Sequence, residues 1–577
     1  MRIGEAQQRS IAQILLSDVQ RAVSAMANTK PGTVAKGAKA PKSTAAAKAA
    51  AAAAKAAAEG PGFAPMPKSL TPELVARLLS RAVPASGTVT TYAPYNGLPL
   101  ADIPQVSAEE IDTVFARARA AQAAWAAMSV KDRAKVFLKY HDLVKDNRDT
   151  IMDLVQIENG KTRRDAFREV MDIMNTARYY ARVAPDLLGP QGRTGVTPVL
   201  TAVKEIHIPK GVVSVISPWN FPFILSVCDT IPALIAGNAV VQKPDNQAAL
   251  CALYGLDLAL QAGLPEGLWQ IALGKSSQIG TPLLDNADYL MFTGSTKTGR
   301  YLAAEAGKRL IASSMELGGK NPMLVLDDAD IERTVEGSLR SCYGGAGQVC
   351  VSIERLYVQD KIYDEFVGAL TERVRNLALG ATYEFGMEMG SLTSQEQLEV
   401  ISSHVEDAVS KGATVLAGAK ARPDLGPLFY EPTLLEGVTD DMTLCRNETF
   451  GPVVSVYRFK TVDEGVALAN DTEYGLAASV WGGTDVDDIA ARIHAGIVTI
   501  NEDYIAAWGS VDAPMGGLGD SGMGSRHGTY GLLKYTSSQT IARQRVLTLQ
   551  PPGPMTHEQF ETGIMMSLDL LKKVRWR

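Results

Sequence analysis

Four short apolar runs between residues 211 and 293 constrain the fold more than any other feature of this chain. The runs are GVVSVIS, NAVVQK, LWQIAL and DYLMF. Helical stretches of about a dozen residues separate them, and this alternation predicts parallel strands joined by crossover helices in a doubly wound sheet. Such sheets bind ligands at the carboxyl ends of their strands. The residues just past those ends are Ser217 to Asn220, Lys243 to Asn246, Gly274, and Thr293 to Ser295.

Length and composition bound the class of protein. At 577 residues, 46% of them hydrophobic, the chain can build two or three domains. A net charge of −6 and a pI near 5.7 give no general attraction to nucleic acid. The longest apolar runs are strand-sized, far short of the roughly 20 residues that a membrane span needs. We therefore expect a soluble, cytoplasmic protein with no membrane span.

The cysteines and histidines argue against structural disulfides and metals. The five cysteines are an odd number and include no C-x-x-C pair, and the six histidines are scattered. A disulfide framework or a zinc site would require closer, paired spacing. We expect a reduced protein without a metal.

One cysteine nevertheless lies in a setting that suits chemistry. Cys350 follows glycines in SCYGGAGQVCVS, so little local bulk shields its sulfur. A free cysteine alone is most often a small buried hydrophobe. Here, however, Glu316 stands at the edge of an apolar strand in MELGGKNP, and Asn220 stands at a strand-to-helix turn in SPWNFP. A thiol, a carboxylate and an amide donor are the parts that acyl chemistry through a thioester requires.

Six ordered motifs carry a resemblance to a known family. They are SPWNFP, FTGSTKTG, MELGGKNP, GQVC, ETFGPV and NDTEYGLAASV. In this order and spacing the chain resembles the aldehyde dehydrogenase superfamily from about residue 85 to about residue 545. Within it, the chain is most similar to actinobacterial enzymes described as NADP-dependent succinate-semialdehyde dehydrogenases.

The resemblance implies an α/β fold with a Rossmann-type cofactor domain, an α/β catalytic domain and a β-arm for oligomerisation into a homodimer or homotetramer. We expect an Ala/Lys-rich extension, disordered or partly helical, before the cofactor domain. The predicted segments are residues 1–62 for the extension, 63–188 and 207–317 for the dinucleotide-binding domain, 318–515 for the catalytic domain, 189–206 and 530–550 for the arm, and 551–577 for the tail.

The resemblance also implies a nicotinamide cofactor. The turn TGSTKTGR lacks the P-loop and G-x-G-x-x-G patterns, but in the family its helix faces the pyrophosphate. The implied cofactor residues are Ser217 at the strand end, Trp219 as a wall, Lys243 and Asn246 at the adenosine ribose, Gly294 and Ser295 at the pyrophosphate, and Glu448 and Phe450 at the nicotinamide.

The residues after NAVVQ favour NADP, with NAD left possible. Asn246 stands where NAD-preferring relatives carry a glutamate, so the charge that would repel a 2′-phosphate is missing. Lys243 could pair with that phosphate. Asp245 would restore the repulsion if it pointed inward.

The implied reaction converts an aldehyde to an acid. Cys350 attacks the aldehyde, Asn220 and the Cys350 backbone N–H hold the oxyanion, hydride leaves for the nicotinamide, and Glu316 activates water. Glu316 should hold a raised pKa because it is partly desolvated. Relatives that transfer the acyl group to coenzyme A lack this base, so we expect hydrolysis.

The substrate stays open between three possibilities. Cys228 and Gly344 stand where succinate-semialdehyde enzymes carry arginines that hold the substrate carboxylate, and Asp229 replaces a common lysine. Arg446 and the pair Arg526 and His527 are charged candidates that we interpret as structural or solvent-facing. We expect succinate semialdehyde as the small-molecule substrate. A medium-chain, long-chain or aromatic aldehyde, or a catalytically silent member of the family, is the alternative.

Overall fold

The computed structural model describes residues 66–196, 201–545 and 550–573. The described residues belong to one compact unit, Pro61–Arg577. The predicted N-terminal extension, residues 1–62, lies outside the described residues. No helix in the described ranges is both long enough and apolar enough to cross a membrane.

The predicted parallel sheet is present and has six strands in the order β19-β9-β8-β5-β6-β7. All neighbours are parallel except β19 and β9. The order reverses between β5 and β8, which makes their carboxyl ends a topological switch point, the usual ligand site of such sheets. The strands are β5 (Val212–Ser217), β6 (Ala239–Pro244), β7 (Trp269–Ile271), β8 (Tyr289–Thr293), β9 (Ala312–Glu316) and β19 (Gly522–Met523).

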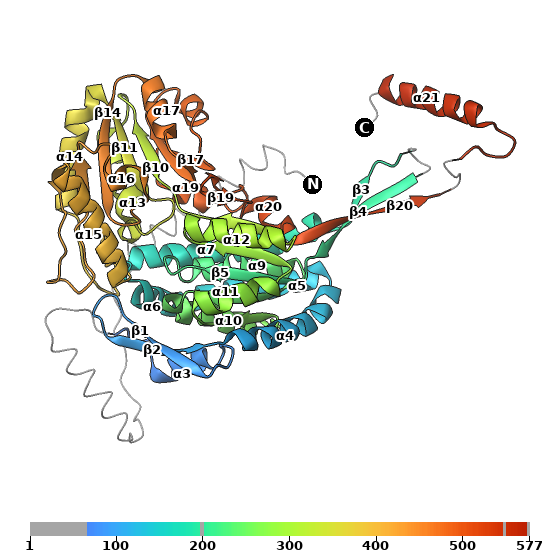
Figure 1. Ribbon diagram of the computed structural model, residues 1–577, viewed down its shortest axis with the longest axis horizontal. Coiled ribbons are helices and arrows are strands. Elements are labelled where there is room, and N and C mark those ends of the chain that lie inside the picture. The colour runs from blue at the N-terminus through green and yellow to red at the C-terminus, as the bar shows by residue number, and fades with distance from the viewer. Residues whose placement is uncertain (1–65, 197–200, 546–549, 574–577) are drawn as a thin grey trace, which may run out of the picture. The chain divides into compact units, whose positions relative to one another are not determined.

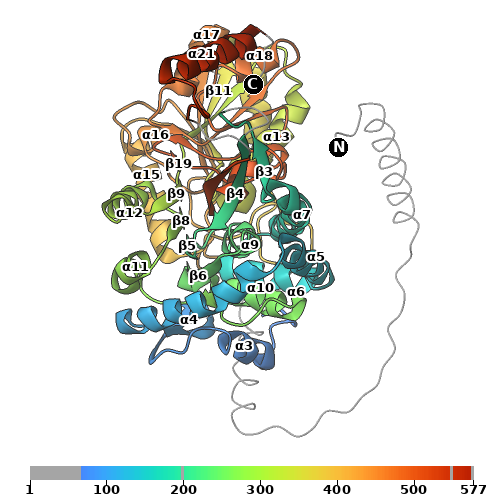
Figure 2. The same ribbon diagram turned by 90° about the vertical axis from the view of Figure 1, so that its right-hand side faces the viewer.

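Helices cover both faces of this sheet, which explains why β6 and β8 are buried along their whole length. Figure 2 shows α11 and α12 on one side of the strands and α5, α7 and α9 on the other. The N-cap oxygens of Ser129 and Thr162 accept backbone N–H bonds at the starts of α5 and α7. The helices around this sheet are α3 (Pro72–Leu79), α4 (Ala108–Ala127), α5 (Val130–Asp146), α6 (Arg148–Asn159), α7 (Arg163–Leu187), α8 (Ile224–Val227), α9 (Thr230–Ile235), η1 (Asn246–Ala248), α10 (Ala249–Ala262), α11 (Ser276–Asp285) and α12 (Thr296–Lys308).

A second sheet of seven strands follows in the chain, in the order β12-β13-β14-β11-β10-β16-β17 (Figure 1). Only β12 and β13 are antiparallel in it. Its strands are β10 (Asn321–Val325), β11 (Ile353–Gln359), β12 (Thr414–Ala417), β13 (Thr433–Glu436), β14 (Val453–Phe459), β16 (Ala477–Trp481) and β17 (Ile497–Ile500). The helices after β9 are α13 (Ile331–Tyr343), η2 (Gly344–Gly347), η3 (Asp360–Ile362), α14 (Tyr363–Arg375), α15 (Gln395–Ser410), α16 (Thr443–Arg446), α17 (Val462–Asn470), α18 (Val486–Ala490), α19 (Ile505–Trp508), α20 (Gly528–Leu533) and α21 (His557–Lys573).

A third, three-stranded sheet consists of β3 (Gln191–Arg193), β4 (Thr201–Pro209) and β20 (Thr536–Gln544). Figure 1 shows β4 and β20 side by side, with β3 beside β4. Residues 530–533, which we placed in the arm, instead belong to α20, and β4 continues three residues beyond the predicted limit of 206. The predicted tail, residues 551–577, contains the helix α21.

The sequence analysis did not predict an antiparallel hairpin near the start of the dinucleotide-binding domain. Its strands β1 (Gly87–Tyr92) and β2 (Pro99–Gln105) precede α4. The turn between them contains Asn96 and Gly97, and Gly97 has a φ of +70°. Asn-Gly between short apolar runs is a strong hairpin signal, so the sequence did contain the information. Two further short strands, β15 (Tyr474–Gly475) and β18 (Leu518–Gly519), pair with each other.

Candidate active site

A pocket of about 240 Å³ gathers most of the residues that the sequence singled out. Its walls come from the carboxyl ends of β5, β8 and β9 and from loops of the seven-stranded sheet. The predicted residues that line it are Trp219, Asn220, Gly294, Ser295, Glu316, Cys350, Glu448 and Phe450. It also includes Pro218 and Thr293 from the predicted strand ends, and three residues that the sequence did not single out, namely Leu317, Gly318 and Gln397.

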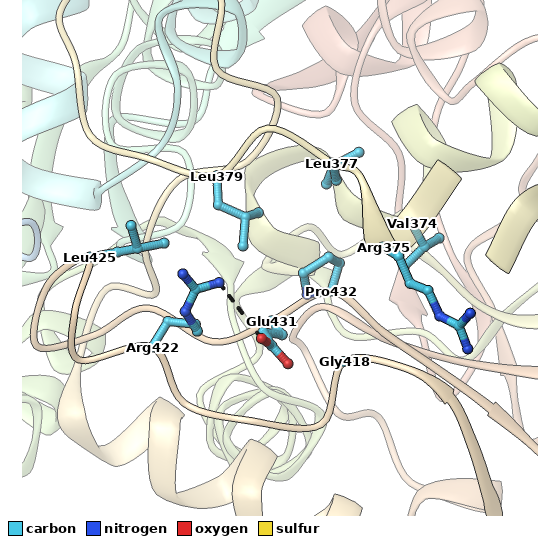
Figure 3. Close-up of a pocket in the computed structure, with 9 residues that line it drawn as sticks. All are labelled: Val374, Arg375, Leu377, Leu379, Gly418, Arg422, Leu425, Glu431 and Pro432. Carbon is cyan, nitrogen blue, oxygen red and sulfur yellow. Dashed lines mark ion pairs between the residues drawn. The ribbon is translucent and has the colours of Figure 1, made fainter. Parts of the chain in front are cut away.

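A larger hollow of about 360 Å³ lies elsewhere and contains none of these residues. Figure 3 shows Arg422 pointing towards Glu431 across it, at 3.6 Å, among leucine and proline side chains. Arg422 also pairs with Asp424 at 2.7 Å. Because its guanidinium is already neutralised and the lining holds no nucleophile, we place the chemistry in the smaller pocket.

Cys350 lies in the loop between η2 and β11, and its side chain is partly exposed. The turn before it has positive φ values at Gly345, Ala346 and Gly347. A side chain at Gly347 would place its Cβ 2.1 Å from the Gly451 carbonyl oxygen, so only glycine fits. Burial raises the pKa of the Cys350 thiol to about 12, Arg526 opposes this rise, and Glu448 and Glu316 add to it.

Asn220 is buried and held from both ends. Its side-chain Nδ2 donates to the Gln348 carbonyl oxygen at 3.0 Å, two residues before Cys350. Its own carbonyl oxygen accepts from Lys161 Nζ at 2.8 Å. Lys161 also pairs with Glu169, whose carboxylate accepts the two N–H groups of residues 223 and 224. The amide is therefore fixed before any ligand binds, which is the condition for an efficient oxyanion donor.

Glu316 ends β9 and is only 3% exposed. It lies between Thr293 of β8 and Gly522 of β19 in the sheet. Neither carboxylate oxygen has a hydrogen-bond partner among the described residues. Burial raises its pKa to about 7, Arg526 and Lys534 oppose this rise, and Asp229 adds to it. A carboxyl group with a pKa near neutrality suits general base catalysis.

The N-terminus of α12 opens onto the pocket. Ser295 is its N-cap and accepts the Thr298 N–H at 3.4 Å. Both Gly294 and Ser295 line the pocket, so the N–H groups and the positive end of the helix dipole are available to an anion.

The loop on the opposite wall carries Glu448 and Phe450. Glu448 Oε1 accepts the Gly319 N–H at 3.0 Å, and burial raises the Glu448 pKa to about 8. The Phe450 ring meets the Trp219 ring edge-on, with centroids 5.7 Å apart. The loop is anchored by Glu354, which accepts the Phe450 N–H at 2.9 Å.

Ser217, Lys243 and Asn246 lie outside the pocket lining, at the carboxyl ends of the neighbouring strands β5 and β6. Lys243 Nζ is buried, and its one hydrogen bond among the described residues is a 3.4 Å contact with the Pro244 carbonyl oxygen. Burial lowers its pKa, and Asp245 opposes this effect. The Asp245 carboxylate turns to its own backbone and accepts the Gln247 N–H at 2.9 Å. A buried ammonium with so few bonds fits an anionic cofactor group.

The other two predicted residues here are held by side chains. Asn246 exchanges amide hydrogen bonds with Gln105 of β2, at 3.3 and 3.4 Å. Ser217 accepts from Gln242 Nε2 at 3.1 Å. The helix N-terminus, the buried Lys243 and the aromatic wall are together suited to a dinucleotide, so the residues present fit a nicotinamide cofactor. Within the described ranges, no cluster of three or more His, Cys, Asp or Glu side chains could hold a metal.

Comparison with known proteins decides the family. A model of the aldehyde dehydrogenase family matches residues 82–541. The chain belongs to the aldehyde dehydrogenase family. It is 52% identical over 460 residues, covering 79% of this chain and 89% of the relative, to a Mycolicibacterium smegmatis protein named as an NADP(+) succinate-semialdehyde dehydrogenase.

Two solved structures are also similar to this aldehyde dehydrogenase. An NADP-dependent enzyme of E. coli has a TM-score of 0.76 and 33% identity, over 79% of this chain and 95% of that one. Betaine aldehyde dehydrogenase of Staphylococcus aureus, solved in complex with NAD+, has a TM-score of 0.77 and 30% identity, over 84% of this chain and 99% of that one.

The two arginine candidates for a substrate carboxylate are already engaged in this aldehyde dehydrogenase. Arg526 is buried and lies 2.9 Å from Asp229. Arg446 is half-exposed and pairs with Asp440 and Asp471. His527 is buried, and neither ring nitrogen has a partner among the described residues. Both arginines are therefore paired with carboxylates, Arg526 in the interior and Arg446 at the surface.

Sequence reasoning missed one guanidinium near the nucleophile's turn. A Cβ at Gly344 would lie 3.8 Å from Nη1 of Arg168, which comes from α7. Arg168 is bonded to Asp503 at 2.8 Å and to the Tyr504 hydroxyl at 3.0 Å. No local pattern could have shown this, because α7 and Gly344 are far apart in the sequence.

Proposed function

We propose that this aldehyde dehydrogenase oxidises succinate semialdehyde to succinate with NADP+, through a thioester on Cys350. The observation that carries the proposal is the convergence of Cys350, Asn220 and Glu316 on one pocket, beside a helix N-terminus suited to a dinucleotide. The convergence also argues against a catalytically silent member of the family, because a silent protein has no need to keep all three groups together.

In the first half of the reaction, the Cys350 sulfur attacks the aldehyde carbon as a thiolate. The Asn220 amide and the Cys350 backbone N–H hold the resulting oxyanion. The burial that raises the thiol pKa makes the free thiolate rare, so this step relies on proton removal as the substrate binds. When bound, the nicotinamide cofactor supplies a hydride acceptor, and loss of the hydride leaves the substrate as a thioester.

In the second half, Glu316 removes a proton from water. The hydroxide oxygen bonds to the thioester carbonyl carbon, the carbon–sulfur bond breaks, and the acid leaves. Glu316 can do this because its carboxylate oxygens are not occupied by other donors in the described structure. The retained base supports hydrolysis over transfer to another thiol.

The choices of substrate and cofactor rest on the mycobacterial relative and on the residues after β6. The relative is named for succinate semialdehyde and NADP(+). Asn246 and the buried Lys243 support NADP+, and one oxygen of the Asp245 carboxylate is occupied by the Gln247 N–H.

One observation favours a second substrate class. Phe221, next to Asn220, stacks on Trp508 with ring centroids 6.0 Å apart, and the Arg526 guanidinium that lies over the Trp508 ring is already paired with Asp229. This arrangement suits an aromatic or medium-chain aldehyde. With such a substrate, the thioester mechanism and the role of NADP+ would be the same.

The decisive experiment is a panel of succinate semialdehyde, hexanal and benzaldehyde, each with NADP+ and NAD+, followed by the absorbance of reduced cofactor. We expect the highest kcat/KM with succinate semialdehyde and NADP+. Cys350→Ser should abolish turnover, whereas the matched control Cys445→Ser, at a half-buried cysteine outside the pocket, should retain it. Equal turnover of hexanal would remove the substrate assignment, and activity in Cys350→Ser would remove the mechanism.

We also propose that the protein is a cytoplasmic homodimer or homotetramer assembled through the three-stranded sheet. β20 forms one edge of that sheet and its side chains are largely exposed. An exposed strand edge is a ready site for pairing with another chain. Analytical ultracentrifugation should give a dimer or tetramer mass, and proline at Gln539 in β20 should reduce it.

A further inference from the structure

A buried ion pair lies beside the strand that ends at Glu316. Arg526 Nη2 is 2.9 Å from Asp229 Oδ2, and both side chains are 3% exposed. The same nitrogen donates to the Thr293 hydroxyl at 2.9 Å. Thr293 is directly opposite Glu316 in the β8–β9 ladder. The guanidinium is therefore fixed by a residue that is itself the neighbour of the carboxylate.

The segment that carries Arg526 is also tied to Glu316 from the other side. Gly522 of β19 pairs with Glu316, and the chain reaches Arg526 four residues later. The Arg526 backbone exchanges hydrogen bonds with Met515, at 2.7 and 2.8 Å. Both strand neighbours of Glu316 are thus connected to Arg526. Thr293 bonds to its guanidinium, and Gly522 precedes it closely in the sequence.

The remaining groups around Glu316 are few. Lys534 Nζ lies 3.4 Å from Asp229 Oδ1, and it is the second cation that acts on Glu316. Tyr289 and Cys350 are protonated at neutral pH, because burial raises the pKa of each to about 12. His527 is neutral there, because burial lowers its pKa to about 3. The charges that govern Glu316 are therefore Arg526, Lys534 and Asp229.

Glu316 has no direct hydrogen bond to any described residue, and the Arg526 Nε is likewise a buried donor without a partner among them. We infer that Arg526, anchored by Asp229 and Thr293, is the positioning residue that keeps Glu316 ionised for thioester hydrolysis. This inference rests on the proposed roles of Cys350 and Glu316. It assigns the ion pair an electrostatic task in deacylation rather than a purely structural one.

The step concerned is a proton transfer. Glu316 takes a proton from water, the oxygen bonds to the acyl carbon, and the carbon–sulfur bond breaks with the electron pair leaving on sulfur. A nearby cation favours the carboxylate that accepts this proton, and a nearby anion disfavours it. Removing Arg526 or removing Asp229 should therefore shift the pH profile in opposite directions.

The test uses hydrolysis of p-nitrophenyl acetate by the full-length enzyme, because an activated ester can acylate a cysteine thiol without an aldehyde or a cofactor. Arg526→Met should move the midpoint of the pH profile upward by on the order of one pKa unit. With Glu316 near pKa 7, the ionised fraction at pH 7 would fall about fivefold, and so would the deacylation rate. Arg526→Lys, which keeps the charge, should recover most of that shift.

Asp229→Asn should move the midpoint downward. The matched control is Asp257→Asn, which removes another buried aspartate that pairs with an arginine, Arg81, at 2.9 Å. Its midpoint should not move. A merely structural ion pair would lower the amount of folded enzyme in both site variants and leave their midpoints unchanged. That result, or shifts of the same sign, would overturn the inference.

The assay also separates this inference from the proposed function. If the ester is hydrolysed with the expected shifts but succinate semialdehyde is not oxidised, only the substrate assignment fails. If Arg526→Met does not fold, the opposite shift expected of Asp229→Asn still decides the question.

Discussion

Replacing Glu354 by glutamine should weaken the fold and the cofactor site together. Glu354 and Lys320 form a buried ion pair, 4% and 3% exposed. Glu354 also accepts the N–H groups of Thr449 and Phe450, at 3.0 and 2.9 Å. Glu354 thus joins two segments that line the pocket, residues 317–320 and the loop that carries Glu448 and Phe450.

The magnitude follows from what the substitution leaves behind. Glutamine keeps the size but not the charge, so the Lys320 ammonium remains buried without a counter-ion. Removing one partner of a buried pair destabilises by about 3–5 kcal/mol. Phe450 also has a φ of +55°, a left-handed conformation that costs about 1–2 kcal/mol and is maintained by its surroundings. Weaker bonds to this loop should let it relax, which raises KM for NADP+ more than it lowers kcat.

The assay is urea unfolding followed by fluorescence, together with steady-state kinetics. Lys320→Met combined with Glu354→Gln is the matched control, because it removes the stranded charge. Most of the stability should return in the double variant, whereas the higher KM should persist, since the loop still lacks a carboxylate acceptor. A single variant within about 1 kcal/mol of the parent would refute the argument, given the usual cost of an unpaired buried charge.

Four further outcomes are expected. Glu316→Gln should give one burst equivalent of reduced cofactor and then stall, as detected by stopped-flow absorbance and by the mass of the acylated protein. In the parent enzyme, deacylation should rise as pH increases through about 7, because Glu316 acts in its ionised form and burial raises its pKa to that value. Asn246→Glu should lower kcat/KM for NADP+ by more than tenfold relative to NAD+, because a carboxylate repels the 2′-phosphate. A repulsion of about 1.4 kcal/mol is enough for a tenfold change. Gly347→Ala should destabilise the fold, seen as a lower urea midpoint, because its Cβ would lie 2.1 Å from the Gly451 carbonyl oxygen.

The part of the site built on the six-stranded sheet could be predicted because strand ends converge. Asn220 follows β5, Ser295 follows β8, and Glu316 ends β9. In a parallel sheet these ends share one edge, so locating the strands was enough to bring the residues together. Cys350 is different, because it precedes a strand of the other sheet. It meets Glu316 because residues 317–320 cross from β9 to β10, and β10 lies beside β11.

The pairs that join distant segments could not be predicted. We considered Arg526 as a charge for the substrate, but it is buried against Asp229, 297 residues away. Arg168 likewise approaches Gly344 from another element. Hydrophobic periodicity reports which face of an element is buried, but it does not report which polar side chain of another element lies against that face.

Buried glutamates show why the sequence alone could not separate scaffold from chemistry. Glu158 is 1% exposed and accepts the N–H groups of Leu250 and Cys251, at 2.6 and 2.8 Å, at the start of α10. Glu158 therefore has a structural role, because its oxygens satisfy backbone donors at the positive end of a helix dipole. Glu316 is equally buried but accepts no such bond within the described structure. A carboxylate that the fold leaves without donors is free to take a proton from water, and that difference lies in the packing around each side chain.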